Sequence, residues 1–153
     1  MPNGFAVSFS IEGEQQLSRR LRVAAERVKD WTPAYEETGV SLTGLFSKDV
    51  FDTQGGVIEE SWSPLKKAYA LRKQRLYGNK GILEATGRMR NSFRYGVRPD
   101  MLQIWNEAEY FKYHQSNKPR TSDLPRRVMM KLAELQRQMV VKIFQAHFRK
   151  SIE

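Results

Sequence analysis

The chain has 153 residues, no cysteine and a formal net charge of +9, a length that suits a single domain over residues 1–153 with one core. The absence of cysteine excludes disulfides, thiolate nucleophiles and cysteine-based zinc sites, and 40% hydrophobic residues exclude wholesale disorder. The basic excess is typical of binding to nucleic acid, an anionic membrane or an acidic protein, or of a solvated surface with no assigned role.

The first elements are predicted from a change of hydrophobic period. Residues 5–11 alternate between large apolar and small side chains, which is the period-2 pattern of a half-buried strand. From Glu14 to Val28 the apolar residues recur at helical spacing. An amphipathic helix is therefore expected to follow the strand.

A second helix is predicted to begin at Thr32-Pro33, where the threonine can cap the first turn and the proline has no N–H to leave unpaired. Its apolar stripe continues to Val50 and ends before Gly55-Gly56. Gly39 and Gly44 lie inside it, and each costs about 1 kcal/mol relative to alanine. Such glycines also allow another element to pack closely.

A short basic helix is predicted after Ser63-Pro64, which repeats the cap-plus-proline signal. Its expected apolar face includes Tyr69 and Leu76, and its other faces carry lysines and arginines. Residues 83–91 are expected to form one or two helical turns, interrupted by Gly87.

The second half of the chain predicts a hairpin and a long terminal helix. Residues 93–97 and 101–105 read as strands joined by a Pro-Asp turn. Paired with residues 5–11, they would form an antiparallel sheet of three or more strands. A short helix over 107–115 and a polar loop over 116–124 are expected next, followed by a helix that opens at Pro125-Arg126-Arg127. The predicted fold class is α+β, with helices packed on the sheet.

The last helix has more apolar surface than one packing partner requires. One stripe recurs at steps of three and four residues, and a second ridge adds Val141, Phe144 and Phe148. We expect one side to cover the sheet and the other to contact a neighbouring subunit.

No catalytic, cofactor or metal site is predicted. The two histidines, His114 and His147, lack further ligands at compatible spacing, so we interpret them as structural. The carboxylate pairs Glu59-Glu60 and Glu107/Glu109 are interpreted as solvated charge. The chain has neither a Gly-x-Ser-x-Gly element nor a phosphate-binding loop. An enzyme is therefore not expected.

The basic run from Lys66 to Lys80 has three interpretations. With Tyr69 and Tyr77 interleaved, it can grip a phosphate backbone, dock on an acidic protein surface or form a solvated helix face. The tryptophans, Trp31, Trp62 and Trp105, are interpreted as core or interface anchors.

Four motifs, in this order, resemble the virion-morphogenesis, or tail-completion, proteins of tailed bacteriophages. The chain has Trp62-Ser63-Pro64-Leu65 before the basic helix, then Ile82-Leu83-Glu84-Ala85-Thr86-Gly87, with Met89 in a position where the family has leucine. Tyr110-Phe111-Lys112-Tyr113-His114-Gln115-Ser116-Asn117 follows the strand pair, with Phe111 and Asn117 as departures. Pro125-Arg126-Arg127-Val128 is similar to the element that opens the last helix, with Val128 in place of a proline.

The resemblance covers roughly residues 50–150 and implies a structural virion protein without cofactors. Such proteins act at the head–tail junction or the head-proximal end of the tail as homo-oligomeric rings, with six the expected number of subunits. The implied partners are other copies and neighbouring neck, connector or tail-tube proteins, near packaged DNA and away from membranes. The protein would be in the host cytoplasm during assembly and then in the virion.

The residues expected at subunit or partner contacts come from the basic run and the apolar anchors. They are Trp62, Lys66, Lys67, Arg72, Lys73, Arg75, Arg127, Phe144 and Phe148. The alternative function is DNA binding through the Lys66–Arg75 helix. The sequence leaves open whether the ring ends the tail or bridges to the head.

Overall fold

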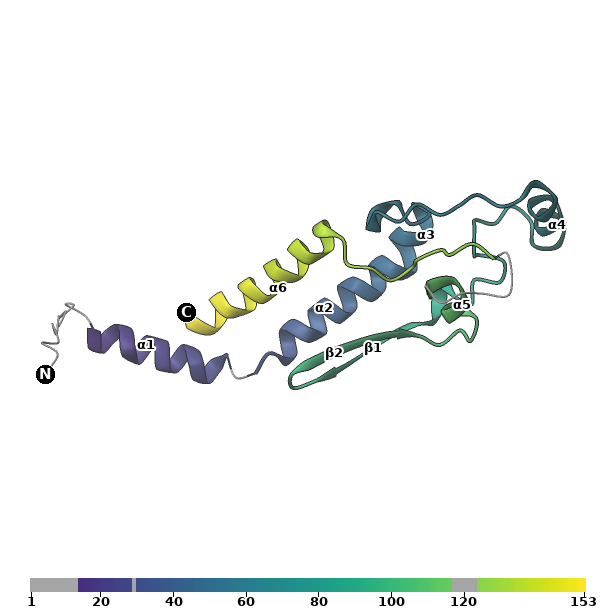
Figure 1. Ribbon diagram of the computed structural model, residues 1–153. Coiled ribbons are helices and arrows are strands. Elements are labelled where there is room, and N and C mark those ends of the chain that lie inside the picture. Colours follow the sequence, from purple (N-terminus) through teal and green to yellow (C-terminus); the bar gives the residue numbers. More distant parts are fainter. Residues whose placement is uncertain (1–13, 29, 117–123) are drawn as a thin grey trace, which may run out of the picture.

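The computed structural model describes residues 14–28, 30–116 and 124–153. It is an α+β structure, as the sequence predicts, with an antiparallel hairpin and several helices (Figure 1). In chain order the elements are α1 (Glu14–Arg27), α2 (Thr32–Gly44), η1 (Leu45–Asp49), α3 (Val50–Asp52), η2 (Gly56–Ile58), α4 (Lys67–Tyr77), η3 (Arg90–Ser92), β1 (Phe93–Arg98), β2 (Met101–Asn106), α5 (Phe111–Gln115) and α6 (Glu134–Ile152).

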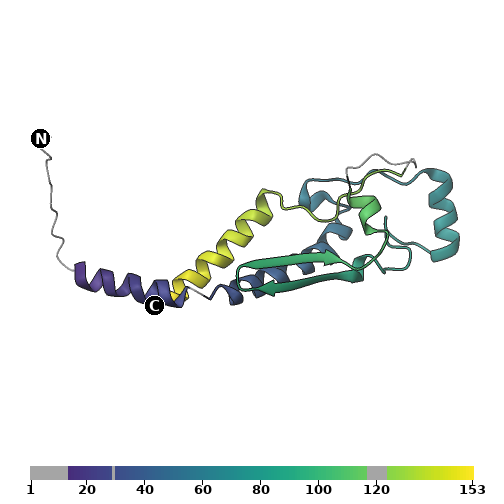
Figure 2. The ribbon, with the colours of Figure 1, turned by 60° about the horizontal axis from the view of Figure 1, so that its bottom comes forward.

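The molecule is elongated, with a helical rod through its middle. α2 continues through the π-helical turn η1 into α3, so residues 32–52 form the helix that their apolar stripe predicts. The hairpin runs along one side of α2 and α6 along another, while α1 and α4 lie at opposite ends (Figures 1 and 2). This arrangement separates the α1–α6 end of the molecule from the α4 end.

The start of the rod differs from the prediction in its capping residue. Trp31 is the N-cap, and its side chain makes no capping hydrogen bond. Instead, the backbone N–H of Thr32 donates to the Asp30 carboxylate, with an N–Oδ1 distance of 3.0 Å. Asp30 thus provides the side-chain acceptor at the start of the helix that we expected Thr32 to provide, while Pro33 lies in the first turn as predicted.

The described part of the chain has a two-stranded sheet, where we expected three or more strands. β1 and β2 pair antiparallel, with Arg98 opposite Met101 across the Pro99-Asp100 turn, which confirms the predicted hairpin. The predicted strand over residues 5–11 lies outside the described residues. The hairpin packs on α2, so a helix, and not a third strand, covers the described sheet.

Gly39 allows the hairpin to approach the rod closely. A Cβ atom built on Gly39 would lie 2.4 Å from Cδ2 of Tyr95, which is far inside van der Waals contact. The Tyr95 hydroxyl then reaches Glu36, one turn earlier in α2, at 3.0 Å. Gly44, by contrast, has no neighbouring atom within 4 Å of the same position, so only the first glycine serves close packing.

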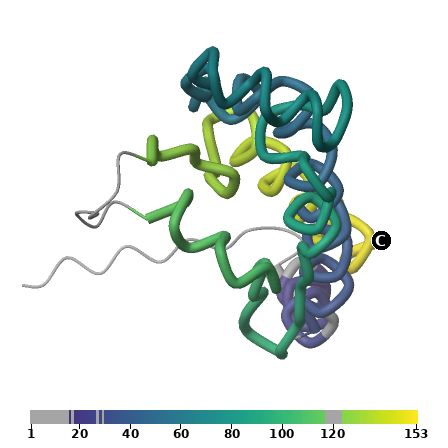
Figure 3. The backbone as a smooth tube through the Cα atoms, turned by 90° about the vertical axis from the view of Figure 1, so that its right-hand side faces the viewer, coloured from purple at the N-terminus to yellow at the C-terminus, as the bar shows by residue number. Residues whose placement is uncertain are grey.

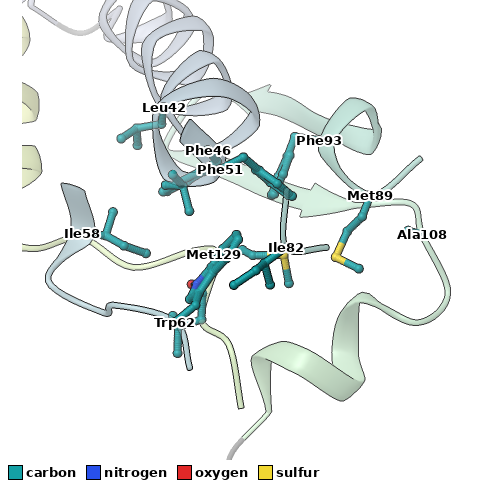
Figure 4. Packing of buried hydrophobic residues seen from close by; sticks show 12 residues of the cluster. Leu42, Phe46, Phe51, Ile58, Trp62, Ile82, Met89, Phe93, Ala108 and Met129 are labelled. Carbon is teal, nitrogen blue, oxygen red and sulfur yellow. The ribbon is translucent and has the colours of Figure 1, made fainter. Parts of the chain in front are cut away.

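The hydrophobic core lies where the end of the rod meets η2, the start of β1 and the segment before α6 (Figure 4). Phe51 packs edge-on against Trp62, with ring centroids 5.3 Å apart, and also against Phe93. The cluster comprises Leu42, Phe46, Val50, Phe51, Ile58, Trp62, Ile82, Met89, Phe93, Ala108, Val128 and Met129.

The last helix begins at Glu134, and not near Pro125 as the periodicity predicts. Residues 124–133, which we call the strap, form no helix and lie between the segment containing α4 and the segment containing α5 (Figure 3). Val128 and Met129 of the strap are buried in the core. The Gln115 side chain forms hydrogen bonds with the backbone of the strap. Its carbonyl oxygen accepts from the N–H groups of Met129 and Met130, and its amide nitrogen donates to the Met130 carbonyl. Tertiary bonds thus replace the helical bonds that the pattern predicts.

Three shorter predictions also shift at their boundaries. α4 begins at Lys67 without a side-chain cap, and not directly after Ser63-Pro64. Residues 83–91 form turns that lead into η3, and Gly87 has a φ of +75°, which favours glycine. The helix expected over 107–115 is present only as α5.

Candidate functional site

Helix α4 exposes its large apolar side chains and buries a charged one. Leu71 is 52% exposed and Leu76 is 63% exposed, while Lys73 is the buried residue of the helix, at 5%. The expected apolar face with Tyr69 and Leu76 is therefore a surface of this subunit, because Tyr69 is also 55% exposed. In a helix whose apolar face packs against its own chain, the apolar side chains are buried and the charged side chains are exposed.

Lys73 anchors α4 to the loop that follows it. Its ammonium group donates to the carbonyl of Gly81. Burial lowers the pKa of Lys73, an effect that Glu84 opposes and that the positive charge of Arg127 reinforces. Glu84 itself is ion-paired with Arg90. Lys73 is thus a buried cation whose closest hydrogen-bond partner is a neutral carbonyl.

Arg127 joins the strap to the segment before α4. Its guanidinium donates to the carbonyl of Ser63, at 3.1 Å from Nε and 2.9 Å from Nη2, and more distantly to the carbonyl of Pro64. Burial lowers the pKa of Arg127, and Tyr69 opposes this effect. Trp62 makes the reciprocal bond, since its indole N–H donates to the carbonyl of Val128 at 2.7 Å. The two chain segments are therefore bonded in both directions.

A groove of about 850 Å³ lies between these two segments, and we call it the α4 groove. One wall comes from residues 63–73, and the others come from residues 83–89, from α5 and from the start of the strap. Its polar lining includes three cations, and none of the described residues that line it is a carboxylate. The lining residues are Ser63, Pro64, Leu65, Lys66, Tyr69, Lys73, Leu83, Ala85, Thr86, Met89, Tyr110, His114, Leu124, Pro125 and Arg127.

The opposite end of the molecule has a second exposed apolar surface, on α6. Phe144 stacks on Trp31 with ring centroids 5.5 Å apart and meets Tyr35 edge-on. Phe148 and Val141 remain 43% and 52% exposed, beside a hollow of about 540 Å³. Another hollow, of about 500 Å³, follows the other side of α6 next to α2. We call this two-sided surface the α6 surface.

The structure divides the predicted contact residues into four groups. Lys66, Lys73 and Arg127 meet at the α4 groove, whereas Lys67, Arg72 and Arg75 lie on exposed parts of α4. Phe144 and Phe148 belong to the α6 surface, and Phe144 is partly covered by Trp31 of its own chain. Trp62 is 7% exposed, so it is a core residue and offers a partner almost no surface.

Sequence reasoning missed the apolar walls of the α4 groove and the role of Gln115. Leu65, Leu83 and Leu124 come from three separate segments, and no local pattern indicates that they meet. Gln115 ends the Tyr-x-x-x-His-Gln motif of residues 110–115, and the motif was the available signal. Its three bonds to the strap explain why an amide is useful at this position, since an amide both donates and accepts.

The described carboxylates and histidines form no recognisable chemical site. Glu60 pairs with Lys131 at 2.8 Å, and Glu107 pairs with Arg94 at 3.4 Å. Among the described residues, no group of three or more histidine, aspartate or glutamate side chains could hold a metal ion. Within the same ranges, no helix has the length and apolar character needed to cross a bilayer.

A family model described as the phage virion morphogenesis family matches residues 13–149. No curated protein and no solved structure matches the chain.

Proposed function

The chain belongs to the phage virion morphogenesis family, and from this premise we propose that it completes the phage tail as a homo-oligomeric ring at the neck or at the head-proximal end of the tail. Family membership confirms the resemblance carried by the four sequence motifs and gives the protein a structural role in virion assembly. The ring, its position and its copy number, for which we propose six, belong to the proposal.

The α6 surface is the observation that carries this proposal. α6 contacts α1 and α2 of its own chain but leaves Leu135, Val141, Phe148 and Ile152 between 43% and 65% exposed. Burying the exposed part of each side chain contributes roughly 1 kcal/mol, about half of the value for complete burial. Several such contacts at one interface together contribute several kcal/mol against the free-energy cost of association.

A ring follows if the α6 surface contacts a different surface of the next subunit. Such a heterologous contact closes into a ring when the rotation between subunits divides a full turn. The elongated shape favours this arrangement, because the two ends of α2 carry different elements (Figure 1). Neighbouring subunits can then lie side by side while their α4 ends remain available to other virion proteins.

The proposal is tested by Phe148→Asp. The substitution removes roughly 1 kcal/mol of burial and adds a carboxylate that costs further free energy to desolvate. We expect subunit association to weaken by roughly 30-fold or more, which corresponds to about 2 kcal/mol. Light scattering coupled to size exclusion would show smaller species, while circular dichroism would remain that of the folded chain.

The matched control is Lys150→Asp, in the same helix but outside both hollows. It should keep the oligomer. Phage lacking the protein should accumulate unjoined heads and tails, and Phe148→Asp should complement this defect poorly. The ring proposal is wrong if wild-type protein is monomeric both in solution and in particles, or if both substitutions act alike.

DNA binding stays a second candidate because of one observation. Residues 61–83 contain six lysines and arginines and no carboxylate, and Lys67, Arg72 and Arg75 are exposed. Binding through phosphate contacts should weaken steeply with salt, with a slope of about −0.9 per neutralised phosphate on a double-logarithmic plot. A gel shift across salt concentrations distinguishes this function from ring assembly, which depends on apolar contacts.

A further inference from the structure

We propose that the α4 groove binds an acidic segment of another protein, one in which carboxylates alternate with large apolar side chains. This interaction goes beyond the ring proposed above and does not depend on it, since the described residues that line the α4 groove and those that line the hollows of the α6 surface are entirely different. The argument rests on the charge of the groove, on its walls and on the exposed side chains beside it.

The charge of the groove favours an anionic occupant. Lys73 and Arg127 are 5% and 4% exposed, and among the described residues the guanidinium of Arg127 donates to the main-chain carbonyls of Ser63 and Pro64. Glu84 reduces the excess charge at Lys73, but its carboxylate pairs with Arg90. A buried cation without a bonded anion is costly, so a carboxylate entering the groove gains a charge-assisted interaction with groups already in place.

The walls of the groove favour apolar side chains next to that carboxylate. Leu65, Leu83 and Met89 line it together with the ring of Tyr69. Its volume of about 850 Å³ lies within the range of sites that enclose a ligand. A nucleic-acid backbone would satisfy the cations but would leave these walls without a matching surface, so the lining favours a peptide over DNA.

The exposed face of α4 extends the same chemistry beyond the groove. Leu71 and Leu76 are more than half exposed and stand among the exposed cations Arg72 and Arg75. A partner that covers them must itself be apolar and acidic. At this basic face a second copy of this chain, with its net charge of +9, is a poorer match than an acidic segment, whereas the contact proposed for the ring is apolar.

The occupant is tested by fluorescence anisotropy with the full-length protein and a labelled peptide of alternating leucines and glutamates. Two matched peptides replace the glutamates by glutamines or the leucines by serines, and a duplex DNA serves as competitor. We expect the leucine–glutamate peptide to bind at least about tenfold more tightly than either matched peptide, since each lacks one of the two required features. Equal binding of the three peptides, or undetectable binding of the first, overturns the proposal.

The position is tested by two pairs of exposed residues that differ in their place relative to the groove. Lys66 and Tyr69 line it, whereas Lys67 and Tyr77 lie outside it on the same helix. Lys66→Glu and Tyr69→Ser should each weaken peptide binding about tenfold, and Lys67→Glu and Tyr77→Ser should change it about twofold or less. Attraction by diffuse charge, and not binding in the groove, would be shown if Lys66→Glu weakened binding no more than Lys67→Glu and Tyr69→Ser no more than Tyr77→Ser. Displacement of the peptide by DNA would refute the assignment in the same way.

These measurements separate the interaction from the ring. The four α4 variants should keep the oligomeric state of the wild type, because none of the substituted residues borders the α6 surface. Phe148→Asp should in turn keep its affinity for the peptide. Failure of either experiment therefore leaves the other interpretable.

Discussion

Alanine substitutions at two glycines in one helical rod should differ in their effect on stability, with only the second one stabilising. Gly39 and Gly44 both lie in α2, and alanine is about 1 kcal/mol more favourable than glycine in a helix. At Gly44 nothing lies within 4 Å of the new methyl group. At Gly39 the methyl carbon would lie 2.4 Å from Cδ2 and 2.8 Å from two other ring carbons of Tyr95, so the hairpin must move away from α2.

The expected magnitudes follow from these distances. Gly44→Ala should raise the free energy of unfolding by up to about 1 kcal/mol. Gly39→Ala gains the same helical term, but overpacking costs about 1–3 kcal/mol, and displacement of Tyr95 disturbs its hydrogen bond to Glu36. We therefore expect Gly39→Ala to be about 0–2 kcal/mol less stable than the wild type, and about 1–3 kcal/mol less stable than Gly44→Ala.

Thermal and urea unfolding of the three proteins at one protein concentration provide the assay, because association shifts the apparent stability. A difference of 1 kcal/mol corresponds to about 2–4 °C in Tm for a chain of this size. If Gly39→Ala melts with or above Gly44→Ala, then Tyr95 does not pack on Gly39 as described, and the position of the hairpin on the rod is wrong.

The remaining predictions concern the strap and the hydroxyl group of Tyr95. Arg127→Met should lower the free energy of unfolding by about 1–3 kcal/mol in urea unfolding, because two carbonyls lose their donor. Arg127→Lys should lose less stability than Arg127→Met, because a lysine can still donate to one of these carbonyls. Gln115→Ala should cost about 2–4 kcal/mol and speed hydrogen exchange of the strap amides, whereas the exposed control Gln103→Ala should cost under about 0.5 kcal/mol; equal losses would contradict the role of the Gln115 side chain in holding the strap. The hydrogen bond to Glu36 raises the pKa of Tyr95 above its ordinary value of 10.0. The stability that this bond adds to the folded state is therefore fully present below that ordinary pKa and is lost as the pH rises through the folded-state pKa. Tyr95→Phe should therefore be less stable than the wild type at neutral pH and lose that deficit in alkali, as urea unfolding at several pH values would show.

Local periodicity predicted the elements whose contacts lie close together in the sequence. The rod over residues 32–52 and the hairpin around Pro99-Asp100 appear as expected. In both, backbone hydrogen bonds and the side-chain period arise within one short segment. The family was likewise predicted from four short motifs, and a model match over residues 13–149 confirms it.

The strap shows where a local pattern fails. Its apolar residues recur at helical spacing, yet the strap forms no helix. Val128 and Met129 of the strap are buried in the hydrophobic core of the protein. Gln115 holds the strap backbone from another element, and the strap carbonyl of Val128 accepts from Trp62, 66 positions away. No window of sequence contains these partners, so the pattern could not distinguish a helix from a strap.

The sequence by itself determined the fold class, the family and the chemical character of the surfaces, because composition, charge and short motifs are properties of the chain alone. Only the tertiary structure decided which surface each residue serves. It placed Trp62 in the core, turned Lys73 inward while Leu71 and Leu76 face outward, and joined Lys66, Lys73 and Arg127 in one groove. The physical reason is that burial depends on contacts between distant segments, so a side chain's exposure is fixed only when those segments pack.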